Sequence, residues 1–186
     1  MPDRAEVLSA LYGACRLAWF DASGMTYFNL TVEGFWRSFF AAVLVAPAYA
    51  ILVGMQSSAE AEDFNLALVF LTESIGYVLA WCAFPIVALL LTRMLGLDRN
   101  YVALIVAHNW SAVPQTAAFV AVVLLGVVLP QGLGTLLVTL TTGAILVYQW
   151  FVIRTALQSS GGIALMLLLV DLVVTSMISA GADRIL

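Results

Sequence analysis

The chain has 186 residues, of which 63% are hydrophobic and 10% are charged, whereas soluble domains carry about 25% charged residues. Its mean hydropathy of +1.06 indicates more apolar surface than a single core could bury, so lipid must be part of the solvent. The formal net charge is −4 and the seven cations are arginines scattered along the sequence, which argues against a nucleic-acid partner that would need clustered basic residues.

Residues 1–34 are predicted to form a cytoplasmic segment with an amphipathic helix. Apolar side chains recur there at helical spacing: Val7, Leu8, Leu11, Tyr12, Cys15 and Trp19. The other side of this helix carries Glu6, Ser9, Gly13 and Arg16. We expect the helix to lie at the membrane interface, or to pack on the rest of the protein or on a partner.

Residues 35–186 are predicted to form an all-α, polytopic transmembrane bundle of five helices. A helix rises ~1.5 Å per residue, so an uninterrupted helix from residue 100 to 153 would extend roughly 80 Å, far beyond the ~30 Å hydrocarbon layer. The turn formers of Pro130–Gly134 divide this uncharged run into two spans. The predicted spans are about 38–55, 66–92, 101–129, 135–153 and 163–180.

The arginines predict the orientation, because basic residues near span ends are retained in the cytoplasm. Six of them fall on one side of a five-span bundle: Arg4, Arg16, Arg37, Arg93, Arg99 and Arg154. Arg184 is the exception. We therefore expect a cytoplasmic N-terminus and an external C-terminus, and a reporter fusion that placed the C-terminus in the cytoplasm would contradict five spans. The acidic pI of about 4.7 is compatible with a bacterial inner membrane.

Three ionisable residues fall within predicted spans: Glu73, His108 and Asp171. A carboxylate at the centre of a span costs about 3 kcal/mol on insertion scales, so Asp171 should face protein rather than lipid. His108 and Asp171 are predicted to lie at the same depth, where they could form a charge-assisted hydrogen bond. They could also serve a proton or ion route, or contact lipid headgroups if the helices tilt.

Two uncharged polar residues accompany them in the third span. Asn109 is expected to form a hydrogen bond to another helix, and Gln115 is expected to lie near Glu73.

The fourth span carries small residues at four-residue spacing: Thr135, Thr139 and Gly143, with Thr142 alongside. Such a ridge lets helices approach closely, and threonine can form hydrogen bonds across the contact. The ridge predicts helix packing, either inside the monomer or against a second copy or a partner.

No catalytic pattern is visible. The chain has one histidine and two distant cysteines, and it contains neither a Gly-rich phosphate loop nor HExxH nor GxSxG. We therefore expect no catalytic, cofactor-binding or metal-binding residues, no cofactor and no enzymatic activity.

The stretch Gly96–Pro114, GLDRNYVALIVAHNWSAVP, consists of a short loop, a helix opening and a proline after an aromatic residue. Together with the five-span layout it resembles the Yip1-like family of small membrane proteins, over about residues 35–180. The resemblance implies a five-helix membrane fold and carries no functional residue. Eukaryotic members of that family are associated with vesicle trafficking through small GTPases, but their acidic, proline-containing N-terminal region has no counterpart here.

Two functions follow as expectations. The first is a non-enzymatic scaffold or accessory subunit of a membrane complex, with lipid and a protein partner or second copy around it. The alternative is a small transporter or channel component with a proton or ion route through Glu73, His108 and Asp171.

Overall fold

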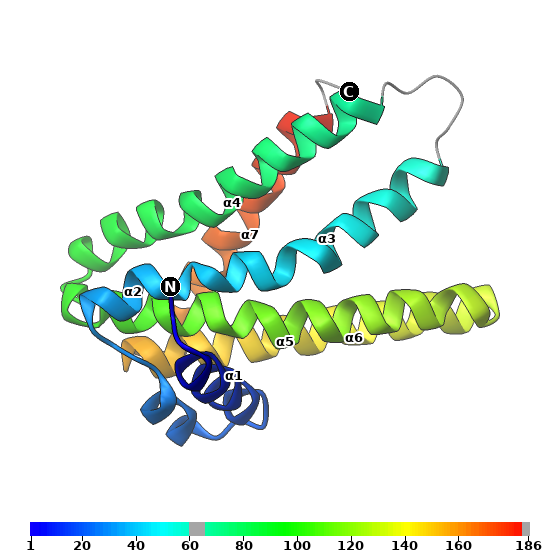
Figure 1. The fold of residues 1–186 in the computed structure, drawn as a ribbon. Coiled ribbons are helices and arrows are strands. Elements are labelled where there is room, and N and C mark those ends of the chain that lie inside the picture. Colours follow the sequence, from blue (N-terminus) through cyan, green and yellow to red (C-terminus); the bar gives the residue numbers. More distant parts are fainter. Residues whose placement is uncertain (60–65, 184–186) are drawn as a thin grey trace.

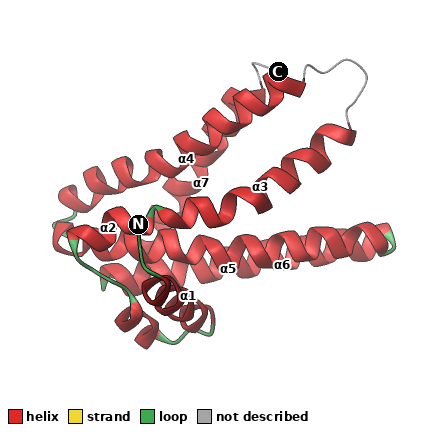
Figure 2. Cartoon of the chain, viewed as in Figure 1, coloured by secondary structure: helices red, strands yellow, loops and turns green. Residues whose placement is uncertain are grey.

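The computed structural model describes residues 1–59 and 66–183. Within those ranges every regular element is a helix and no strand occurs (Figure 2). Five stretches are long and apolar enough to cross a bilayer: Val32–Met55, Leu68–Met94, Asp98–Val128, Gln131–Leu157 and Gly161–Ala182. The chain is therefore an all-α integral membrane protein with five candidate spans.

Three short elements precede the bundle, each begun by a side-chain cap. Asp3 caps α1 (Arg4–Ala18), Asp21 caps η1 (Ala22–Tyr27) and Thr31 caps α2 (Val32–Ser38). These side-chain oxygens accept hydrogen bonds from backbone N–H groups that lack a partner within the helix. Hydrogen bonds from Ser23 and Arg16 lower the pKa of Asp21 to about 2, so its carboxylate stays charged in mildly acidic solution as well as at neutral pH.

Helix α1 packs on the bundle through a side that matches the predicted apolar side only in part, since Val7 and Leu11 pack against the core. Its buried residues are the small or aliphatic Ala10, Gly13, Ala14 and Leu17. Leu8, Tyr12, Cys15 and Trp19, placed on the apolar side from the sequence, are exposed.

Close backbone approach explains why small residues of α1 are buried. A Cβ on Gly13 would lie 2.7 Å from the carbonyl oxygen of Gly24 in η1, so only a small side allows this contact. The buried hydroxyl of Tyr148 also donates to the Ala14 carbonyl oxygen at 2.7 Å. α1 is thus held against the bundle, and contact of its exposed side with a membrane stays a prediction.

The bundle itself consists of the remaining elements: α3 (Phe40–Ala59), α4 (Leu66–Met94), η2 (Asp98–Asn100), α5 (Tyr101–Val128), α6 (Gln131–Leu157) and α7 (Gly161–Asp183). α5 and α6 form a long antiparallel hairpin, α3 packs on α5, and α7 contacts both α4 and α6. At one end these helices converge near α1 and α2, and from there α3 and the α4–α7 pair splay away from the hairpin (Figure 1).

Two turns are shorter than their composition indicated, so the helices that follow them begin earlier than predicted. α6 begins at Gln131 rather than Thr135, since Pro130 acts as the N-cap and the next residues are already helical. α7 begins at Gly161 rather than Ile163, after Gln158 ends α6 in the left-handed conformation at φ 50°. Glycine at position 134 of α6 allows close packing on α5, because a Cβ there would lie 3.0 Å from the Gly126 carbonyl oxygen.

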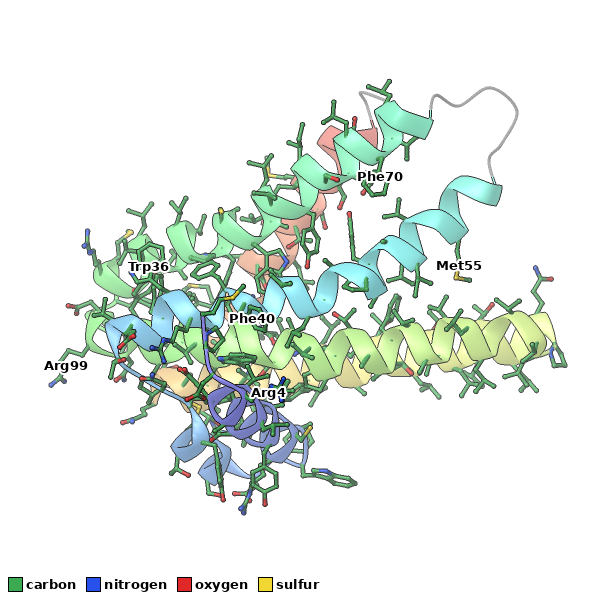
Figure 3. All side chains as sticks on the ribbon, viewed as in Figure 1. Arg4, Trp36, Phe40, Met55, Phe70 and Arg99 are labelled. Carbon is green, nitrogen blue, oxygen red and sulfur yellow. The ribbon has the colours of Figure 1, made fainter. Side chains whose placement is uncertain are left out.

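Three exposed arginines mark the converging end of the bundle, called here the arginine end: Arg93, Arg99 and Arg154. Figure 3 shows Arg99 there, pointing away from the helices. Which side of a membrane this end faces stays a prediction. Residues 60–65 of the acidic loop, and Arg184, lie outside the described residues.

Candidate intramembrane cavity

A cavity of about 330 Å³ lies where the splayed helices leave the α5–α6 hairpin. All five spanning helices line it, mostly with apolar residues. Its polar and aromatic lining residues are Tyr49 of α3; Tyr77, Trp81 and Phe84 of α4; His108, Asn109, Gln115 and Thr116 of α5; Gln149 of α6; and Asp171 and Thr175 of α7. A largely apolar pocket with a few polar groups that orient a ligand is typical of small-molecule sites.

A chain of hydrogen bonds fixes the imidazole of His108. Gln115 Nε2 donates to Gln149 Oε1 at 2.7 Å, and Gln149 Nε2 lies 2.5 Å from His108 Nδ1. Because the amide nitrogen is a donor, Nδ1 is the acceptor and Nε2 carries the proton of the neutral ring. Phe84 stacks on the same ring, with centroids 4.2 Å apart and planes 22° apart. The orientation of the ring is therefore set by two neighbours, Gln149 and Phe84.

Asp171 lines the same cavity as His108. Each keeps part of its surface on the cavity. The direct hydrogen bond that could join them is not formed in the described structure, where the ring is bonded through Nδ1 to Gln149. The carboxylate is left facing the cavity.

Glu73 is linked to the cavity indirectly. The hydroxyl of Tyr49 donates to Glu73 Oε2 at 2.5 Å, and Tyr49 itself lines the cavity. The Tyr49 ring packs against the ring of Tyr77, with centroids 4.8 Å apart. Tyr49 thus links Glu73 to the cavity wall, whereas Gln115, expected near Glu73, is bonded to Gln149.

Asn109 forms the interhelical contact expected of it. Its Nδ2 donates to the Ser38 hydroxyl at 2.9 Å, which joins α5 to the end of α2, and both side chains are buried. This bond has a structural role, since it closes the first span against the third just beside the cavity.

The small-residue ridge of α6 does not pack inside this chain. Thr135, Thr139, Thr142 and Gly143 are all exposed, and no atom lies within 4 Å of the Cβ position of Gly143. The three threonine hydroxyls donate to carbonyl oxygens one turn back in α6. Of the two alternatives left by the sequence, contact with a second copy or a partner remains a prediction.

A second cavity, of about 400 Å³, lies near the arginine end between η1, α5 and α6. Its lining includes Arg99, Asn100 and Gln158. None of the three ionisable residues found within the spans lines it, so the cavity around His108 and Asp171 is the candidate site.

Among the described residues, no group of three or more histidine, cysteine, aspartate or glutamate side chains could hold a metal ion. Comparison of the chain with family models, with curated proteins and with solved structures finds no match.

Proposed function

We propose that the chain is a small, non-enzymatic membrane transport protein, or the solute-binding component of one, with a proton or ion route through the five-helix cavity. One observation carries the proposal: residues from every candidate span surround a cavity that holds both His108 and Asp171. Helices that all contribute to one site can change its access from either side when they move relative to one another.

The free-energy cost of placing the Asp171 carboxylate within a span favours a transport role over a purely structural one. A carboxylate within a span is expensive to insert and usually pairs with another group when its role is structural. Here Asp171 faces a cavity instead of a hydrogen-bonded partner on a neighbouring helix. Intramembrane carboxylates and histidines placed in this way are typical of proton relays.

Glu73 extends the route toward the end opposite the arginines. It lies near the start of α4, at the splayed end, and is bonded to Tyr49 on the cavity wall. A proton could pass between the cavity and that end through these two side chains. By the same proposal the arginine end is cytoplasmic, in a bacterial inner membrane, and reporter fusions at both termini would test that orientation.

Replacing Asp171 with asparagine is the test. Purified protein in liposomes, with a pH-sensitive dye inside, should collapse an imposed pH gradient, and Asp171→Asn should reduce that rate at least tenfold. The matched control is Asp98→Asn, the same change at an exposed carboxylate of η2, which should keep the wild-type rate. Equal rates for wild-type protein, both variants and empty liposomes would overturn the proposal.

The second candidate function is a scaffold or accessory subunit, favoured by the exposed ridge at Thr135, Thr139, Thr142 and Gly143. Small residues at a helix surface allow close approach of another helix. Extraction in mild detergent at native abundance, followed by mass spectrometry, should then recover a partner in fixed proportion. Recovery of the chain alone, as a monomer, would exclude this role.

A further inference from the structure

The lining of the cavity selects the charge of its ligand. Asp171 is the one carboxylate among the lining residues described, and no arginine lines the cavity. Glu73 adds a second carboxylate behind Tyr49. An anion entering this site would meet negative charge in a poorly solvated place, whereas a monovalent cation would compensate the carboxylate that the fold leaves facing the cavity.

The hydrogen bonds of the lining point to a ligand that donates. Five polar lining side chains already donate to protein groups: Tyr49 to Glu73, Tyr77 to the Ala42 carbonyl, Asn109 to Ser38, Gln115 to Gln149, and Gln149 to His108. The acceptor oxygens of Asp171 and of the Gln115 amide remain without a hydrogen-bond partner in the described structure. These two acceptors can receive hydrogen bonds from the N–H groups of a ligand.

The part of the wall that α3 and α4 provide is rich in aromatic residues. Tyr49 of α3 and Tyr77, Trp81 and Phe84 of α4 all line the cavity. Successive rings are near one another, with Tyr77 and Trp81 centroids 6.1 Å apart. Aromatic faces attract cations and also accept an apolar body, so the wall fits both parts of an amphipathic amine.

We infer that the ligand of this cavity is a small protonated amine with an apolar body, whose ammonium group binds Asp171 and whose body packs on the aromatic wall of α3 and α4. The inference rests on the proposed transport function and names the substrate class of the same site. At about 330 Å³ the cavity is at the lower end of the range of small-molecule sites, roughly 300–1,000 Å³, so the amine is small.

The test uses three ligands of similar shape and different charge: benzylamine, benzyl alcohol and benzoate. Titration calorimetry on the full chain in detergent should show benzylamine binding at least tenfold tighter than benzyl alcohol, with no binding of benzoate. Asp171→Asn should remove the preference for benzylamine, and Asp98→Asn should keep it. Equal affinity for the three ligands, or a preference that survives in Asp171→Asn, overturns the inference.

A second variant keeps the inference testable if Asp171→Asn fails to fold. Trp81→Leu retains the carboxylate and removes one ring of the wall, and it should weaken benzylamine binding about tenfold. Unchanged binding in Trp81→Leu would contradict the aromatic wall.

The proton-flux assay separates the two proposals. Proton flux that depends on Asp171, without any preference for benzylamine, overturns the amine inference and leaves the transport function standing. Selective benzylamine binding without flux overturns the transport function and supports the amine as ligand.

Discussion

Replacing Gly34 with alanine should lower the free energy of unfolding by about 2–3 kcal/mol, near the upper end of the range for overpacked sites. A Cβ at this position would lie 1.9 Å from the carbonyl oxygen of Asn29, which is a backbone atom and cannot rotate away. Either α2 or the preceding turn must shift. That shift would also strain the cap in which the Thr31 hydroxyl accepts from the Gly34 N–H at 3.1 Å.

Thermal unfolding in detergent, followed by tryptophan fluorescence, is the measurement for Gly34→Ala, and Trp36 is close enough to report on α2. The control is Gly143→Ala, which introduces the same methyl group in a helix where no atom lies within 4 Å. It should be neutral, or stabilising by up to about 1 kcal/mol through helix propensity. Equal unfolding midpoints for Gly34→Ala and wild-type protein would show that the turn at Asn29 can move without loss of stability.

The number of spans could be predicted because it depends on quantities that the sequence carries directly. Long uncharged runs cannot be buried in so small a chain, and the length of a helix in a bilayer is fixed by its rise per residue. The turn at Pro130 was harder to place, because Gly132 and Gly134 indicate a break locally but are helical in the structure. The reason for glycine at position 134 is its packing against Gly126 of the neighbouring helix α5, which the local sequence does not reveal.

The packing side of α1 could be predicted only in part from apolar periodicity. Periodicity measures where large apolar side chains gather, and on a membrane protein those side chains can face outward, as Trp19 does at 86% exposure. Close helix packing selects small residues instead, here Ala10, Gly13 and Ala14.

The candidate site was predicted in part. Ionisable residues within a span are rare and costly, so His108 and Asp171 stood out, and both line one cavity. Tyr49, Tyr77 and Gln149 went unnoticed because a tyrosine or an amide within a span costs little and carries no charge. Gln149 had a signal that could have found it, since it is the one amide side chain in the predicted span 135–153.

Replacing Gln149 with leucine should cost about 2–4 kcal/mol, because it leaves two groups without their partner. Gln149 is buried, accepts from Gln115 and donates to His108 Nδ1. An unsatisfied buried polar group costs about 1–3 kcal/mol, whereas removing both partners of a hydrogen bond is nearly neutral. The thermal midpoint in detergent should therefore fall for Gln149→Leu and partly recover in the double variant Gln115→Leu with Gln149→Leu.

The same substitution at Gln131, which is exposed at the start of α6, provides the control and should leave the midpoint unchanged. Gln149→Leu should also lower the proton flux of the liposome assay, because the imidazole loses the bond that fixes its tautomer and orientation. A midpoint and flux equal to those of Gln131→Leu would show that the imidazole of His108 does not depend on this chain of amides. In that case Phe84, stacked on the ring, would be sufficient to orient it.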